Sequence, residues 1–306
     1  MTKPIGVLVM AYGTPGAPEE IEPYYTRIRH GHPPTPELLD DLIRRYDAIG
    51  GISPLAKLTR DQVEGIEAAL EVVAPGGYLV RFGAKYTEPS IEAAAEELAA
   101  SCDLVIGLVL TPHQASLGSM QYHERAALSF AETSVSYVAI PSWYDLPAFA
   151  SLQGERLNAA LAKLTPQQRE NAHVLFTAHS LPEKILETGD PYPDQVGHSG
   201  ELIAAAAGVR TWSVAWQSAG RTRDPWIGPS ILDELPRLQA EGASAVIACP
   251  VGFVSDHLEV LFDLDVEAMK VANDLKLAFG RTESLNADPA FIAVLVSAIE
   301  RAQGGH

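Results

Sequence analysis

The sequence predicts an α/β protein built on parallel sheets. Short apolar runs, rich in Val and Ile and nearly free of charge, alternate with longer segments of helical periodicity. Such runs are typical of strands covered on both faces, and their regular alternation with helices is typical of βαβ units. The expected strands are residues 5–10, 78–82, 104–110, 135–140, 174–178, 212–216, 245–251 and 275–279.

The helices between these runs have recognisable first turns. Thr35 is a preferred N-cap residue, and Pro36 suits the first helical position because its fixed φ and missing N–H cost nothing there. Thr59 and Gln62 have capping-box spacing, which predicts that the next helix begins at Thr59. Pro289 opens the last helix in the same way as Pro36.

Composition and charge exclude several classes of protein. The 306 residues include 22 Lys and Arg against 39 Asp and Glu, a net charge of −17, which disfavours binding to nucleic acid or anionic lipid. Two cysteines are too few for a disulfide framework or a four-thiolate cluster. The longest apolar runs are far shorter than the roughly 20 residues of a membrane span, and the N-terminus lacks a signal-peptide pattern. We expect a soluble, cytoplasmic protein without stable membrane association.

The two halves of the chain resemble each other at three places, in the same order. Any two buried parallel strands look alike, but three ordered matches favour a duplicated α/β design. We therefore predict two domains, residues 1–142 and 143–287, with a final helix at 288–306 packed on the first domain. Residues 7–15 match 174–182, residues 78–82 match 212–216, and residues 110–112 match 248–250.

Tyr12 and His179 occupy equivalent positions at the ends of equivalent strands. Ligands of open α/β sheets bind beyond the carboxyl ends of the strands, so we expect these side chains to face one cleft from opposite walls. A neutral imidazole near pH 7 suits a base or a metal ligand. The alternative for His179 is a hydrogen-bonded loop residue.

Three carboxylates follow a buried strand of the second half at helical spacing. Glu259, Asp263 and Glu267 would share one face of an α-helix, although like charges at this spacing are mildly unfavourable. We interpret the row as a cation path, because oxygen and imidazole ligands suit a divalent metal such as Fe²⁺. The alternative is a solvated acidic face, but Glu259 has apolar neighbours on both sides.

Basic residues are scarce and gather in the first fifth of the chain, around Arg29 and Arg45. They are either favourable cations at helix C-termini or the rim of a pocket for a flat, anionic ligand, helped by the hydroxyls of Ser53 and Tyr122. The remaining polar candidates are expected to be structural or exposed, and no nucleotide-binding glycine motif is present. They are His113, His123, His173, His198 and His257, together with Cys102 and Cys249 as buried apolar groups.

Several stretches of the sequence resemble the ferrochelatase family, most closely its soluble coproporphyrin type from Gram-positive-type bacteria. The resemblance covers nearly the whole chain. It implies two similar Rossmann-like domains whose parallel sheets face a central porphyrin cleft. The stretches are residues 10–15, 48–55, 178–184, 189–193, 216–218, 224–229 and 250–259.

The resemblance implies insertion of Fe²⁺ into a porphyrin with release of two protons. Iron is then a substrate, no cofactor is permanently bound, and the partners are the porphyrin and a transiently bound next enzyme of haem biosynthesis; we expect a monomer. It assigns catalysis and metal binding to His179 and Glu259, and an outer metal relay to Asp263 and Glu267. The residues assigned to the porphyrin are Tyr12 (also axial ligand of the product iron), Arg29, Arg45, Tyr46, Ser53 and Tyr122.

Three departures from the family pattern bear on the substrate. His30 stands where soluble relatives often carry a second Arg, which weakens one expected propionate contact. Residues 16–33 are polar rather than an apolar lip, which favours the soluble, coproporphyrin type. Residues 273–306 contain no cysteine, so no iron–sulfur cluster is expected. Alternatives that stay open are a protoporphyrin IX ferrochelatase, a non-catalytic porphyrin or haem carrier, and a Co²⁺ or Ni²⁺ chelatase.

Overall fold

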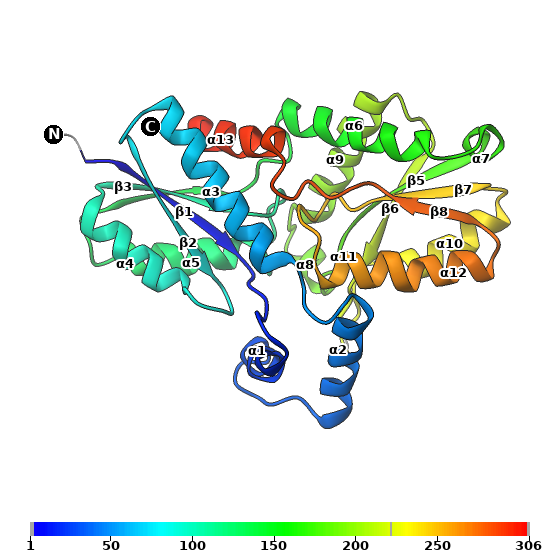
Figure 1. Cartoon of the computed structure of the whole chain (residues 1–306), viewed down its shortest axis with the longest axis horizontal. Coiled ribbons are helices and arrows are strands. Elements are labelled where there is room, and N and C mark those ends of the chain that lie inside the picture. Colours follow the sequence, from blue (N-terminus) through cyan, green and yellow to red (C-terminus); the bar gives the residue numbers. More distant parts are fainter. Residues whose placement is uncertain (1–2, 221, 305–306) are drawn as a thin grey trace.

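The computed structural model, which describes residues 3–220 and 222–304, contains two four-stranded parallel sheets (Figure 1). Their strand orders, β2-β1-β3-β4 and β6-β5-β7-β8, are the same order repeated, which confirms the predicted α/β class and the ordered repeat. The first sheet contains β1 (Ile5–Ala11), β2 (Tyr78–Ala84), β3 (Leu104–Val109) and β4 (Ser136–Ile140). The second contains β5 (Ala172–His179), β6 (Trp212–Gln217), β7 (Ala245–Cys249) and β8 (Ala278–Arg281).

Two details of the strand prediction are wrong. Gly6 and His173 are equivalent when the first sequence match is extended by one residue, and they pair with Val105 and Val246, so Val105 corresponds to Val246 and Leu110 to Val251. The third sequence match aligned residue 110 with residue 248 and is therefore three residues out of register. Short apolar stretches that end in Pro match in several registers, and only strand pairing distinguishes them. The last strand begins at Ala278, because the preceding helix extends to Asp274 and a turn with Lys276 at φ 56° follows it.

Helices cover both faces of each sheet (Figure 1). In the first half they are η1 (Pro18–Glu20), α1 (Ile21–Ile28), α2 (Pro36–Ala48), α3 (Leu55–Val73), α4 (Ile91–Ser101) and α5 (Ser119–Phe130). In the second half they are α6 (Pro147–Ala162), α7 (Pro166–Glu170), α8 (Lys184–Glu187), α9 (Tyr192–Ala207), α10 (Ile231–Ala240), α11 (Leu258–Phe262), η2 (Asp263–Ala268) and α12 (Met269–Asp274). The last helix is α13 (Pro289–Gly304).

The helix starts predicted at Pro36 and Pro289 are correct, and the one predicted at Thr59 is wrong. Thr35 caps α2, its Oγ1 accepting the Leu38 N–H at 3.4 Å. The capping box at Thr59 does not form, because α3 already begins at Leu55. Gln62 instead turns inward and donates from Nε2 to Ser255 Oγ at 2.8 Å, so its side chain ties the first half to the second.

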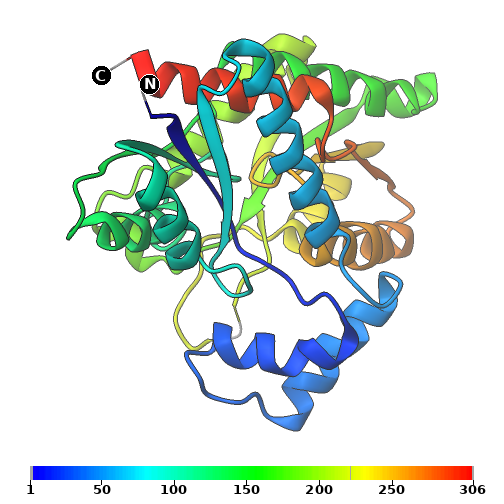
Figure 2. The same ribbon diagram turned by 60° about the vertical axis from the view of Figure 1, so that its left-hand side comes forward.

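A shared apolar core joins the two halves. It contains strand residues from both sheets and the fully buried rings of Trp143, Phe149 and Phe291. Burying a large apolar side chain stabilises a fold by about 1.5–3 kcal/mol, so this layer holds the sheets together strongly. Helix α13 packs against α3, β3 and β4 of the first half and also against α6 (Figure 2).

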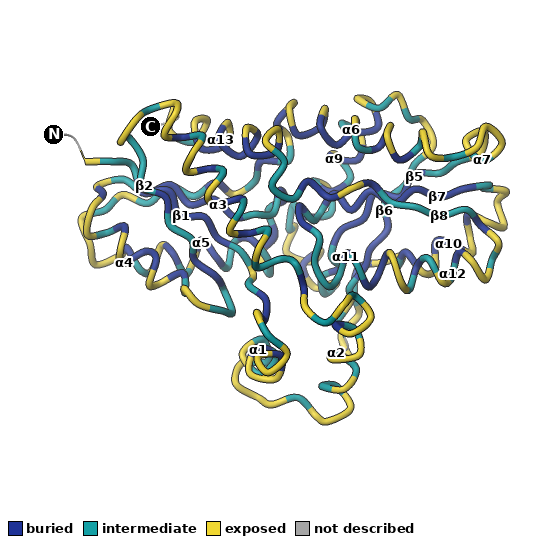
Figure 3. The backbone as a smooth tube through the Cα atoms, in the orientation of Figure 1, coloured by how far each residue is buried: buried dark blue, intermediate teal, exposed yellow. Residues whose placement is uncertain are grey.

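Helices α1 and α2 project from this body beyond the carboxyl end of β1 (Figure 2). Their residues are mostly exposed or half-buried (Figure 3), and the buried ones are Ile21 and Tyr24 on α1 and Tyr46 on α2. Within residues 3–220 and 222–304, we find no helix with the length and apolar character needed to cross a bilayer.

Candidate active site

The carboxyl ends of the two central strands carry the predicted pair of side chains. Tyr12 follows β1 directly, and His179 is the last residue of β5. The Tyr12 ring contacts the ring of Tyr86 at a centroid distance of 4.7 Å and that of Tyr24 at 6.5 Å, yet 41% of the residue is exposed. Its aromatic surface is therefore open to a ligand.

Glu259 lies beside the imidazole of His179, with Oε1 3.6 Å from Nε2. The Nδ1–H of His179 donates to the carbonyl of Ser180, because a carbonyl oxygen only accepts, and this leaves Nε2 directed at the carboxylate. Burial is the largest single cause and lowers the pKa of His179. The charge and the hydrogen bond of Glu259, the Ser180 carbonyl and the charge of Asp263 together outweigh burial and raise that pKa to about 9. The imidazolium form therefore predominates at neutral pH, whereas the sequence suggested a neutral ring.

A second imidazole, which the sequence interpretation missed, contacts the other oxygen of the same carboxylate. His257 Nε2 lies 3.6 Å from Glu259 Oε2, while its Nδ1–H donates to the Ser255 carbonyl at 2.9 Å. Burial alone would raise the pKa of Glu259, but His179 and His257 together hold it well below its usual range. The available signal was the two-residue step from His257 to Glu259 at the start of α11.

The carboxylate also acts on the phenols of the first half. Burial is the largest cause of the raised pKa values of Tyr12, Tyr122 and Tyr46, and the Glu259 charge raises each of them further. Coulomb interactions of this kind weaken with distance and are screened by solvent. Glu259 of the second half is therefore close enough to act electrostatically on these phenols of the first half.

Beyond Glu259 the predicted row of carboxylates continues in altered helical geometry. Helix α11 passes into a π-helical turn at Asp263, so the expectation of a continuous α-helix is wrong. Asp263 is 6% exposed and its Oδ2 accepts from Ser218 Oγ at 2.5 Å. Burial and then Glu259 raise the pKa of Asp263 to about 6, and the charge of Glu267 adds to this rise.

No three His, Cys, Asp or Glu side chains are arranged to hold a metal ion in the part of the chain that the structure describes.

Other polar residues that the sequence assigned to structural roles lie in the interior of the fold. His113 and His123 are buried and hydrogen-bonded, and Cys102 and Cys249 are buried, as predicted.

Arg45 is the predicted anion-binding residue that comes nearest to this row. Its Nε contacts Asp41 Oδ2 at 3.0 Å, its Nη1 lies 3.9 Å from Asp263 Oδ1, and its guanidinium lies over the Phe262 ring at 5.0 Å. Arg29 lies apart from this group, at the end of α1, where its Nε donates to the His32 carbonyl at 3.3 Å.

The predicted hydroxyl groups are less accessible than the arginines. Ser53, Tyr46 and Tyr122 are 4%, 3% and 7% exposed, respectively. Ser53 Oγ accepts the Leu55 N–H at 3.2 Å and so supports the first turn of α3. Its own hydroxyl hydrogen remains available for a ligand.

Lys85 is a further cation that the sequence did not single out. It follows β2, its ammonium lies 5.0 Å from the centroid of the Tyr122 ring, and it donates to Gln121 Oε1 at 2.6 Å. Burial, followed by Arg125, lowers the pKa of Lys85 to about 8. Its place just after a strand, at the same sheet edge as Tyr12, was the available signal.

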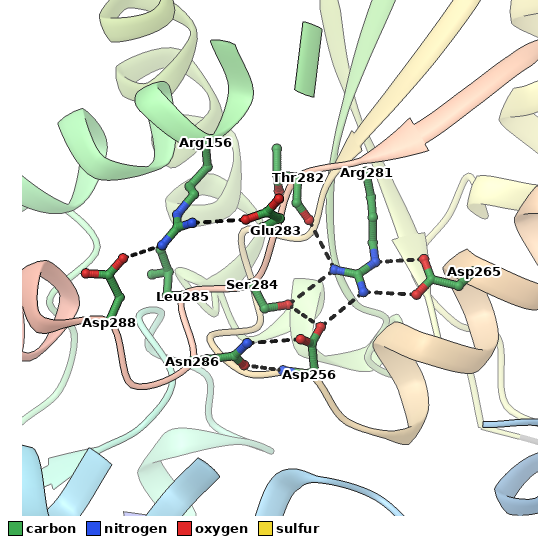
Figure 4. Close-up of a pocket in the computed structure, with 10 residues that line it drawn as sticks. All are labelled: Arg156, Asp256, Asp265, Arg281, Thr282, Glu283, Ser284, Leu285, Asn286 and Asp288. Carbon is green, nitrogen blue, oxygen red and sulfur yellow. Dashed lines mark hydrogen bonds and ion pairs between the residues drawn. The ribbon is translucent and has the colours of Figure 1, made fainter. Parts of the chain in front are cut away.

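An ion-pair network supports the segment that carries Ser255 and His257. Asp256 accepts from Asn286 Nδ2 at 3.0 Å and lies 3.1 Å from Arg281, which also holds Asp265 (Figure 4). The open cavity beside this network is lined by charged residues that already pair with one another, and Tyr12, His179 and Glu259 are not among them (Figure 4).

Comparison with known proteins places this geometry in a family. Two solved chelatase structures share the fold: SirB from Bacillus subtilis with Fe³⁺ (TM-score 0.60, 14% identity, 99% of this chain and 98% of that one) and CbiX, described as the terminal enzyme of sirohaem biosynthesis in denitrifying bacteria (TM-score 0.51, 15% identity, 97% and 99%). At these identities the likeness shows the fold alone.

Similarity in sequence extends over almost the whole chain. The coproporphyrin III ferrochelatase of Halalkalibacterium halodurans is 44% identical over 303 residues, covering 98% of this chain and 97% of the relative. The coproporphyrin III ferrochelatase of Bacillus subtilis strain 168 is 43% identical, covering 99% of each chain. Residues 4–303 match the family model described as ferrochelatase. The chain therefore belongs to the ferrochelatase family.

Proposed function

We propose that this protein inserts Fe²⁺ into coproporphyrin III and so produces coproheme for haem biosynthesis. The observation that carries the proposal is the carboxylate of Glu259, held between His179 and His257 and close enough to Tyr12 for its charge to raise the pKa of that phenol. Full-length relatives that bear the name coproporphyrin III ferrochelatase support the choice of porphyrin.

Metal insertion requires that two pyrrole N–H bonds break and four iron–nitrogen bonds form. A planar macrocycle keeps its nitrogen lone pairs in the ring plane, so a cleft that grips the periphery helps by bending the ring, at a strain on the order of 1–5 kcal/mol. We assign the grip to Arg29 and Arg45, with Tyr46, Ser53 and Tyr122 as hydroxyl partners. The two pyrrole protons leave through His179 to water, and iron takes their place.

Glu259 sets the proton affinity of His179 in this scheme. While the carboxylate is unneutralised, His179 keeps its proton and cannot accept another. A cation that reaches Glu259 cancels the carboxylate charge, so the pKa of His179 falls and the imidazole releases its proton and becomes a base. Iron arrival and proton acceptance are thus linked through one carboxylate, with Tyr12 as the proposed axial ligand of the product iron.

We also propose that the protein works as a cytoplasmic monomer without a resident cofactor. Asp263 and Glu267 form the proposed outer metal relay, and the product passes to the next enzyme through a transient contact. Size-exclusion chromatography with light scattering tests the monomer, since a dimeric mass contradicts it.

The test of function is anaerobic Fe²⁺ insertion into coproporphyrin III and protoporphyrin IX, side by side, followed by absorbance. We expect faster insertion into coproporphyrin III, and in His179→Ala a rate lower by about 10²–10⁴-fold with porphyrin binding retained. Equal rates with both porphyrins contradict the substrate assignment. Binding without any absorbance change on addition of Fe²⁺ identifies a carrier, and insertion of Co²⁺ or Ni²⁺ alone identifies a different chelatase.

A further inference from the structure

We propose that Arg45 exchanges partners when the substrate binds, leaving Asp263 for a propionate and so uncovering a buried carboxylate for the incoming cation. The inference rests on the proposed function and concerns the order of events within that site. Porphyrin binding then prepares the metal path, rather than occurring independently of it.

The geometry around Arg45 suits an exchange. The side chain of Arg45 is only 25% exposed. Its Nη1 nevertheless lies 3.9 Å from Asp263 Oδ1, which is longer than a charge-assisted hydrogen bond of about 2.7–2.9 Å. The Phe262 ring under the guanidinium supports it without fixing its direction. A propionate that reaches the free edge of the guanidinium gains shorter contacts than the one it displaces.

Asp263 has the complementary property, because its carboxylate depends on a nearby cation. It is 6% exposed and close enough to Glu259 that the two negative charges oppose each other. Arg45 is the cation that offsets this repulsion, while Ser218 supplies one hydrogen bond. A buried carboxylate that loses its counter-ion either takes up a proton or gains another cation, and the cation that this reaction supplies is the metal.

Arg45 also connects α2 with the second half of the molecule, as does Arg44, whose guanidinium lies 5.4 Å from the centroid of the Phe262 ring. Arg45 lies on α2, which projects from the sheets with most of its residues exposed (Figure 3), and its contacts with Phe262 and Asp263 reach α11 and η2 of the second half. A ligand carboxylate at the cleft rim therefore acts on the metal side of the site through one side chain. By linkage, porphyrin and cation strengthen each other's binding.

The test is a double-mutant cycle on coproporphyrin III affinity, measured by fluorescence titration without metal. If Asp263 competes with the propionate, Asp263→Asn tightens porphyrin binding by about two- to fivefold, the worth of a partly exposed ion pair. In an Arg45→Gln background the same substitution leaves affinity unchanged. Asp40→Asn is the matched control, since it removes one negative charge from α2 without touching the Arg45–Asp263 pair.

Two results overturn the exchange: no tightening in Asp263→Asn, or equal tightening with and without Arg45. Circular dichroism checks the fold of each variant, and Arg45→Met supplies the same background should Arg45→Gln fail to fold. Wild-type protein that neither binds coproporphyrin nor inserts iron contradicts the proposed function instead. Active wild-type protein with an additive cycle contradicts only the exchange.

Discussion

Replacing Glu259 with Gln removes the charge that sets the proton affinity of His179. At 3.6 Å the interaction of two unit charges is about 1.2 kcal/mol with the dielectric constant of water and about 4.6 kcal/mol with an effective value of 20. Each 1.36 kcal/mol corresponds to about one pKa unit. Because the side chains are 34% and 39% exposed, solvent screening favours the lower figure, so we expect the pKa of His179 to fall by about 1–2 units in Glu259→Gln.

The pKa of His179 is measurable by NMR from the imidazole carbon-bound proton as a function of pH. His179→Gln identifies the resonance by its disappearance. His173 lies near the start of β5, away from Glu259, and is hydrogen-bonded to Ser213 of β6. It is an internal control whose pKa we expect to stay constant. An unchanged pKa of His179 in Glu259→Gln refutes the claim that this carboxylate controls its protonation.

The same pair contributes to stability with a definite pH dependence. The pKa of His179 is higher in the folded protein than in the unfolded chain, so its share of the stabilisation is complete below the ordinary pKa near 6.5. That share is lost as the pH rises through about 9. Urea unfolding at pH 6 and pH 9.5 therefore shows a difference in unfolding free energy between wild type and Glu259→Gln that shrinks at the higher pH.

Three further outcomes follow from the same contacts. His257→Gln raises the pKa of Glu259 and slows iron insertion while coproporphyrin affinity is kept, and a loss of affinity alone in steady-state assays contradicts that reading. Gln62→Leu leaves the buried hydroxyl of Ser255 without this hydrogen-bond donor and lowers the unfolding free energy by about 1–3 kcal/mol in denaturant titrations. An unchanged midpoint of unfolding contradicts the structural role of Gln62. Tyr12→Phe alters the visible spectrum of the iron product but not porphyrin binding, whereas an identical spectrum excludes the phenol as axial ligand.

Much of the fold was predictable because its signals are local. Alternating strands and helices follow from side-chain period, and the Thr35 cap follows from one hydroxyl and one proline. The start of α3 was not predictable in that way. Gln62 has capping-box spacing, but its amide is more favourably placed against Ser255, nearly 200 residues away in sequence, and no local pattern contains that partner.

The residues of the candidate site also differ in whether a local sequence signal identifies them. The internal repeat located Tyr12 and His179, because duplicated strands end at duplicated positions, and apolar neighbours marked Glu259. His257 was expected to be structural or exposed, because its spacing from the other histidines is not typical of metal ligands. Its partner is instead the carboxylate of Glu259, two residues away at the start of α11. The π-helical turn at Asp263 has no sequence period of its own and was read as α-helix.

Protonation is the property that sequence could not supply, and it decides how this site works. The carboxylates of Glu259 and Asp263 are close enough to repel each other, and each has basic side chains beside it: two imidazoles for the first and Arg45 for the second. In a protein of net charge −17, such local compensation reduces the repulsion that an anionic porphyrin would meet. In the mechanism proposed above, the charge of Glu259 links two events, because arriving iron cancels that charge and His179 then releases its proton. Proton release and metal arrival are then two consequences of one electrostatic exchange rather than separate catalytic steps.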